Sequence, residues 1–193
     1  MADRTAPDAL LLVQDLVNTL DIETGEDALT AEGGVAAFLR AHDVPEPGLE
    51  EGELASVLAG LRELRAALRA VCMAHTTRTE VDAGTTRTLG RLLARAPLVL
   101  AVGPDGGAAL RPAGALDGAA RLTALIAAGI ATAAADGTWA RLKACEAHDC
   151  RWVFYDKSPA GRSRWCTMAV CGSRAKMRTY RARRAGSSSA EPS

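Results

Sequence analysis

Aromatic side chains are scarce in this chain: two Phe, two Tyr and three Trp make up 4 % of its 193 residues. Apolar residues nevertheless reach 48 %, so a hydrophobic core has to be assembled mainly from Leu, Val and Ala. Because Ala and Leu are among the strongest helix formers, the composition predicts a mainly α fold.

Long apolar runs and a secretion signal are also missing. The best candidate for a membrane span, residues 122–135, is shorter than the roughly 18–20 residues that cross a bilayer. The N-terminus lacks the charged-then-apolar layout of a signal peptide. We therefore expect a cytoplasmic protein without a membrane partner. In that reducing compartment, five cysteines favour a metal site or free thiols over disulfides.

No group of residues in the N-terminal part suggests catalysis. His42 and His75 lie far apart, and neither a Ser-His-Asp pattern nor a phosphate-binding glycine motif accompanies them. We expect that the protein is not an enzyme. Asp15 and Asn18 lie one helical turn apart, so they either face a pocket together or form hydrogen bonds within the core.

The formal net charge of zero hides a division of charge along the chain. Residues 138–184 hold 12 Lys/Arg and 3 Asp/Glu, a net of +9, and the remainder carries −9. Such asymmetry indicates a polyanionic partner for the basic part. The alternatives are that the acidic part covers the basic one, or that its charge only serves solubility.

The spacing of apolar residues predicts helices in the N-terminal part and one β-hairpin within it. The expected helices cover residues 10–20 with Asp8 as N-cap, 30–42 capped by Thr30, 51–74, 82–95, 116–135 and a short 139–144 capped by Thr138. Strands 98–102 and 108–111 flank a Gly-Pro-Asp-Gly-Gly turn. Cys72 lies on the apolar face of its helix and is expected in the core.

Three parts follow from this pattern. Residues 1–137 are expected to form a helical N-terminal domain, and residues 138–184 a small C-terminal domain. Residues 185–193 are rich in Ser and are expected to be a disordered tail.

The remaining four cysteines form two pairs, Cys145-x4-Cys150 and Cys166-x4-Cys171, separated by 15 residues. Two cysteine pairs on either side of such a loop are the usual way to hold tetrahedral Zn²⁺, and four Cys ligands make a closed, structural site. The alternatives are two disulfides, buried free thiols, or His148 in place of one cysteine. Because the segment is short of apolar residues, loss of one ligand is expected to unfold residues 141–184 and to spare the N-terminal helices.

Residues 141–184 closely resemble the CGNR zinc finger. The cysteine pairs match, as do the blocks Trp152-Val-Phe-Tyr-Asp156 and Ser163-Arg-Trp-Cys-Thr-Met168. In Cys171-Gly172-Ser173-Arg174, Ser stands where the family name has Asn, which affects a turn hydrogen bond and no zinc ligand.

A second motif, Asp15-Leu-Val-Asn-Thr19, resembles one in the ABATE domain, which usually precedes this finger. The two resemblances imply a bacterial transcription regulator with one structural Zn²⁺ in a small treble-clef-like or knuckle-type finger.

The segment after the last cysteine is strongly basic. Gly172 is expected to break the chain and Ser173 to cap a helix that carries Arg174, Lys176, Arg178, Arg181, Arg183 and Arg184. Such a helix can follow phosphates or enter a major groove, so DNA is the expected partner. The alternatives are RNA, a solvated or docking face, and a protein-interaction or structural module that binds no DNA. Domain order adds the hypothesis of a small-molecule ligand in the N-terminal domain, and a homodimer is a separate hypothesis.

Overall fold

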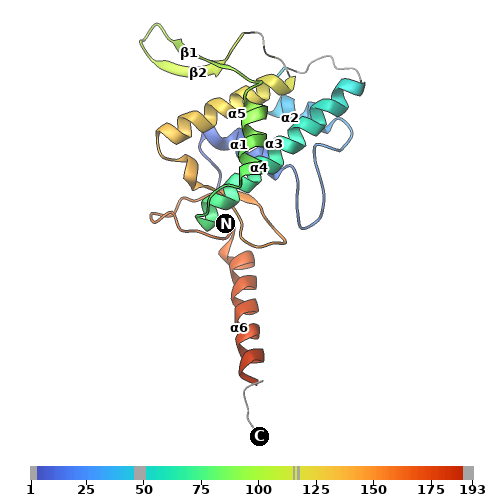
Figure 1. The fold of residues 1–193 in the computed structure, drawn as a ribbon, viewed down its shortest axis with the longest axis vertical. Helices are drawn as coiled ribbons and strands as arrows, with labels where there is room; N and C mark the ends of the chain where they lie inside the picture. Colours follow the sequence, from blue (N-terminus) through green and yellow to red (C-terminus); the bar gives the residue numbers. More distant parts are fainter. Residues whose placement is uncertain (1–3, 46–50, 115, 117, 189–193) are drawn as a thin grey trace.

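The computed structural model describes residues 4–45, 51–114, 116 and 118–188, and within these residues the fold is mainly α (Figure 1). Its helices are α1 (Asp8–Asn18), α2 (Gly34–Ala41), α3 (Glu51–Thr77), α4 (Ala83–Leu93), α5 (Gly118–Ala135) and α6 (Ser173–Ser188). Two antiparallel hairpins accompany them, β1 (Leu98–Val102) with β2 (Ala108–Pro112) and β3 (Leu142–Ala144) with β4 (Val153–Tyr155). The predicted mainly α class and the first hairpin are confirmed.

Some predicted helix starts were wrong. Asp8 is the first residue of α1 rather than its cap, since Pro7 occupies the cap position. α2 begins at Gly34, after the predicted Thr30, because Gly33 adopts a left-handed backbone with φ of 67° that a helix cannot continue through.

The predicted helix over 139–144 was also wrong. Its first three residues form a single 3₁₀ turn, η1 (Trp139–Arg141), and the next three become strand β3. Leu142, Lys143 and Ala144 are drawn into the extended form because they pair with Tyr155, Phe154 and Val153 of β4.

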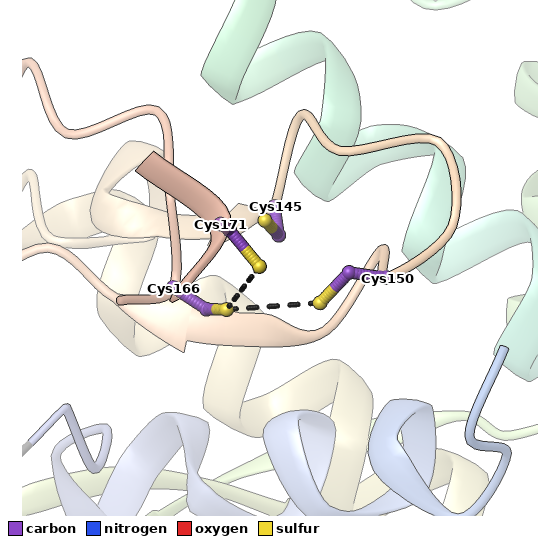
Figure 2. A group of neighbouring side chains, drawn as sticks. All are labelled: Cys145, Cys150, Cys166 and Cys171. Carbon is purple, nitrogen blue, oxygen red and sulfur yellow. Dashed lines mark hydrogen bonds between the residues drawn. The ribbon is translucent and has the colours of Figure 1, made fainter. Parts of the chain in front are cut away.

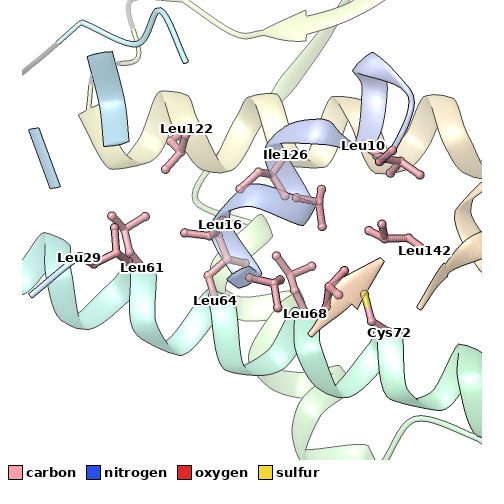
Figure 3. Close-up of a cluster of buried hydrophobic side chains, with 14 of the residues drawn as sticks. Leu10, Leu16, Leu29, Leu61, Leu64, Leu68, Cys72, Leu122, Ile126 and Leu142 are labelled. Carbon is pink, nitrogen blue, oxygen red and sulfur yellow. The ribbon is translucent and has the colours of Figure 1, made fainter. Parts of the chain in front are cut away.

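The main hydrophobic core lies between α1, α3 and α5 (Figure 3). Leu16 of α1, Leu64 and Leu68 of α3 and Ile126 of α5 are among its fully buried members. α1 and α5 cross closely at Gly129, where a Cβ would lie 1.9 Å from the Ala9 carbonyl oxygen, so no larger residue fits there. Cys72 is fully buried in this core, as predicted.

Hairpin β3–β4 belongs to the same core although it follows all of the N-terminal helices. Leu142, Ala144, Val153 and Tyr155 join the buried cluster of α1, α3 and α5. Figure 3 shows Leu142 beside Leu10 and Cys72. Lys143 and Phe154, which alternate with these residues, point to the other face. The hairpin therefore packs against the N-terminal helices with one face and against the cysteine-rich segment with the other.

Side chains from two helices complete the outer edges of this hairpin. The Asn18 side chain donates to the Val153 carbonyl and accepts from the Val153 N–H, both at 2.8 Å. On β3, the Thr76 hydroxyl donates to the Ala144 carbonyl at 2.7 Å, and His75 Nδ1 lies 2.9 Å from the Leu142 oxygen. Asn18 thus forms hydrogen bonds within the structure, while Asp15 lies near His42 at 3.6 Å.

α6 extends away from the body along the long axis of the molecule, and β1–β2 lies at the opposite end (Figure 1). An ion pair between Arg174 and Glu23, at 2.9 Å, links the start of α6 to the acidic N-terminal part. The arrangement contradicts the hypothesis that the acidic part covers the basic helix. α6 also reaches Ser188, so residues 185–188 of the expected tail are helical, and residues 189–193 lie outside the described residues.

α5 is long and apolar enough to cross a membrane by length and composition alone. It includes residues 118–121 in addition to the apolar run seen in the sequence. In the fold it packs against α1 and β2, with Leu122, Ala124 and Ile126 buried. This is the position of a core helix.

The Asn18 contact yields a direct test. Replacement Asn18→Ala leaves the buried Val153 N–H without its acceptor, so we expect the free energy of unfolding to fall by about 2 kcal/mol. Chemical denaturation followed by circular dichroism measures the change. Asp15→Ala, one turn earlier on α1, is the matched control and is expected to change stability by less than about 1 kcal/mol. Equal effects of the two substitutions would contradict the role given to Asn18.

Candidate metal centre

The four paired cysteines come from three different local structures. Cys145 directly follows β3 and Cys150 lies in the turn that leads to β4. Cys166 lies in the loop before the C-terminal helix, and Cys171 lies within the π-helical turn η2 (Met168–Gly172) at its start. A hairpin with ligands at its turn, followed by a helix with a ligand in its first turn, corresponds to the treble-clef-like form of the prediction.

The four sulfur atoms converge on one point (Figure 2). All four lie within 4.8 Å of one another, and the Sγ–Sγ distances are 3.7 Å from Cys150 to Cys166 and 3.6 Å from Cys166 to Cys171. Four sulfurs at about 2.3 Å from a tetrahedral ion would be separated by roughly 3.8 Å. The geometry therefore fits a tetrahedral metal ion, and the cysteines are free thiols rather than disulfides.

Protonation of the thiols supports the same conclusion. The hydrogen bond with Cys150 lowers the pKa of Cys145, whereas their hydrogen bonds to Cys145 raise the pKa of Cys150 and of Cys166. Burial raises the pKa of Cys171. The thiols thus shift one another's pKa values, because several negative sulfurs cannot lie so close together without a cation. A divalent ion supplies that positive charge and displaces the remaining protons.

A small hydrophobic cluster covers one side of the sulfurs. Ala147 and Phe154 are buried in it, and Trp165 packs against it. The guanidinium of Arg4 lies 5.0 Å from the centre of the Phe154 ring. His148, considered as a ligand from the sequence, has an exposed side chain and is outside the group of sulfurs.

A buried ion pair fixes the loop between the two cysteine pairs. Lys143 Nζ lies 2.9 Å from the Asp156 carboxylate, and both side chains are almost completely buried. Burial alone would raise the pKa of Asp156, but hydrogen bonds from Lys143, Ser158 and Ser163 outweigh it and lower the pKa. Arg141 donates to the carbonyls of Asp156 and Ser158 at 2.9 and 2.8 Å. These contacts hold Cys166 in position from the far side of the loop.

The last ligand is carried by a helix that starts earlier than predicted. Thr167 caps it by accepting from the Val170 N–H, and η2 continues directly into α6. Gly172 does not break the chain: it is the last residue of η2 and packs closely against the Met168 side chain, since a Cβ there would lie 2.9 Å from the Met168 sulfur. Ser173 is not a cap, and its hydroxyl donates back to the Met168 carbonyl at 3.1 Å.

Basic side chains of α6 form an exposed stripe beside the cysteines. Arg174, Arg178 and Arg181 follow one another at helical spacing and line a groove of about 500 Å³ together with Val170 and Met177. Lys176 is exposed on another side of the helix. The side chains of Arg183 and Arg184, also predicted to contact DNA, lie outside the described residues.

Sequence reasoning missed the residues that hold the site in place. Asn18 was considered for a pocket or a core hydrogen bond, without β4 as its partner. In the sequence, Lys143 is one of the 12 Lys/Arg of the basic part, with no sign that it pairs with Asp156. The one available signal was the Trp-x-Phe-x-Asp block, in which residues two apart lie on the same side of a strand, so that Asp156 follows Phe154 on that side.

Two family models match the chain, in the order that the sequence predicts. The CGNR zinc finger model matches residues 141–184. The ABATE model, described as "Putative stress-induced transcription regulator", matches residues 11–137. No curated protein matches the chain. The chain therefore belongs to the ABATE family and carries a CGNR zinc finger after its ABATE domain.

Proposed function

We propose that this protein is a cytoplasmic, DNA-binding transcription regulator whose C-terminal finger holds one structural Zn²⁺. The observation that carries the proposal is the cluster of four sulfurs at the base of an exposed basic helix. The proposal assigns no enzymatic activity to the chain.

Zinc is the proposed ion because the donors are four thiolates in a tetrahedral arrangement, the ligand set typical of structural zinc sites. Cys145, Cys150, Cys166 and Cys171 complete the coordination shell, so no position remains for a reacting water molecule. Binding of the ion would tie the hairpin turn to the start of α6, and would thereby fix the direction in which the helix leaves the body.

The first test of the proposal is metal content. Elemental analysis of the purified protein is expected to give about one equivalent of zinc, and Cys166→Ser is expected to lose most of it. His148→Ala, which changes an exposed neighbour, is the control and should keep the full equivalent. A wild-type zinc content well below one equivalent would contradict the proposal.

Loss of zinc should also weaken the whole fold. Because β3–β4 packs in the core of α1, α3 and α5, Cys166→Ser is expected to lower the unfolding temperature of all the helices. This replaces the expectation from the sequence that the N-terminal helices would be spared.

DNA is the proposed partner because α6 is positively charged, extends away from the body and has exposed basic side chains. Its 16 residues extend about 24 Å away from the body (Figure 1), and the side chains of Arg174, Arg178 and Arg181 are exposed. Arg174, Arg178 and Arg181 line one side of it, as in a helix that follows a phosphate backbone or enters a major groove. Arg174 also pairs with Glu23, so its contact with a phosphate would compete with that ion pair.

Binding to duplex DNA should therefore depend steeply on salt. Reversing the charge of Arg178 and Arg181 to Glu is expected to weaken binding and to reduce the slope of log K against log salt by about two. Fluorescence anisotropy over a salt series measures both quantities. The control reverses two exposed arginines of the N-terminal part, Arg87 and Arg111, so that the net charge changes equally. If wild-type protein with full zinc shows no binding at low salt, the alternative of a protein-interaction module replaces the DNA proposal.

The small-molecule ligand and the homodimer stay predictions. A cavity of about 610 Å³ lies between the turn after α1 and the finger, lined in part by Asn18, Asp21 and Trp152. A ligand there would change the fluorescence of the half-exposed Trp152. For self-association, the exposed Leu100 and Val102 of β1 offer the most apolar surface among the described residues, and light scattering would measure the mass.

A further inference from the structure

A second group of cations lies apart from α6, at the end of α3. A cavity of about 350 Å³ opens there between α3, β3 and the loop that leads to Cys166. Its lining is mostly cationic, with one carboxylate and two hydroxyls: Thr76, Thr77, Arg78, Lys143, Glu146, Arg162 and Arg164. None of the roles described above uses Arg78 or Arg162.

Only some of these charges are balanced by acidic neighbours. Lys143 pairs with Asp156, and Arg164 pairs with Glu146. Among the described residues no carboxylate forms an ion pair with Arg78 or with Arg162. The cavity therefore holds two guanidinium groups whose charge is not compensated by the protein.

The backbone around Arg162 is fixed on both sides, while its side chain is exposed. The preceding carbonyl, of Gly161, accepts from Lys143 Nζ at 2.7 Å. The following N–H, of Ser163, donates to the Asp156 carboxylate at 2.8 Å. The ion pair that organises the loop thus also presents Arg162 to the cavity, with little conformational entropy left for its backbone to lose on binding.

Arg78 occupies a position that its side chain does not favour. It follows the last turn of α3 in a left-handed backbone with φ of 59°, where glycine is the usual residue. Strain of this kind indicates a function when the side chain has a use. The Arg78 guanidinium reaches the Gly161 carbonyl at 3.5 Å, across the mouth of the cavity. Arginine at this position therefore supplies charge at a site where glycine would suit the backbone better.

We propose that Arg78 and Arg162 form a phosphate-binding site, with Arg164 at its edge. Guanidinium groups match the oxygens of a phosphate group in paired hydrogen bonds, and two of them balance its charge. The carbonyl groups at the C-terminal end of α3 carry partial negative charge, which disfavours a phosphate group. Phosphate binding therefore depends on the positive charge of both arginines. The end of α3 lies on the side of the body from which α6 extends (Figure 1). The phosphate group can therefore belong to DNA held by α6 or to a free phosphorylated molecule, and the site itself does not depend on the DNA proposal.

The first arm of the test uses inorganic phosphate and the full-length, zinc-loaded protein. In an NMR titration at constant pH and ionic strength, we expect saturable shifts of the backbone amides of residues 76–79 and 161–164. Arg162→Gln should weaken binding roughly tenfold or more, and the exposed Arg111→Gln should leave it unchanged. Arg78→Gly should weaken it similarly without lowering the unfolding temperature, because glycine relieves the left-handed backbone. The absence of saturable shifts, or equal affinity in the two glutamine variants, would overturn the proposal.

The second arm identifies the source of the phosphate group. If DNA supplies it, Arg162→Gln is expected to reduce the salt slope of DNA binding by about one, relative to Arg111→Gln. An unchanged slope together with loss of inorganic phosphate binding assigns the site to a free phosphorylated molecule. Both results support the site. If the wild-type protein binds no DNA, the role of α6 fails and the phosphate titration alone decides on the site.

Discussion

Among the described residues, hairpin β3–β4 pairs with no further strand, so its outer edges depend on side chains from α1 and α3 and on the Arg4 carbonyl, which accepts from the Tyr155 N–H. A two-stranded hairpin is marginal by itself, and unpaired backbone groups within a core are costly. The Asn18 side chain forms hydrogen bonds with both backbone groups of Val153 in β4. Thr76 and His75 form hydrogen bonds with backbone carbonyls of β3. The hairpin in turn places Leu142 and Ala144 in the core between these helices. Neither the N-terminal helices nor the hairpin is complete without the other.

The alternation of side chains along these short strands joins the core to the metal centre. In β3, Leu142 and Ala144 face the helices, whereas Lys143 reaches Asp156 and fixes the loop that carries Cys166. In β4, Val153 and Tyr155 face the core, and Phe154 lies against the sulfurs. Two family models divide the chain at about residue 140, but the packing is continuous across that boundary. Free energy gained from a bound metal is therefore shared by all the helices that contact the hairpin.

The extent to which the sequence predicts this structure depends on how local each interaction is. Helix α3 and hairpin β1–β2 follow from apolar spacing and a glycine-rich turn, which act within a few residues. The four cysteines could be assigned to one metal site because cysteine ligands recur in closely spaced pairs along a sequence. Strand β3 could not be predicted, because its residues are extended only by pairing with β4. β4 follows later in the sequence, after the turn that carries the first two cysteines. Likewise Gly172 lies within a continuous helical segment, and sequence alone does not distinguish that from a chain break.

The late position of β3–β4 in the sequence has a consequence for synthesis on the ribosome. When α1, α3 and α5 have emerged, the core surface that receives Leu142, Ala144 and Val153 is still open. The last cysteine of the cluster is residue 171, so the hairpin can be clamped only after that residue has been made. Until that residue has been made and an ion has bound, the N-terminal helices expose the apolar surface that the hairpin covers. In a cell short of that ion, new chains would remain at this stage and be open to proteases, so the amount of the regulator would follow the metal supply.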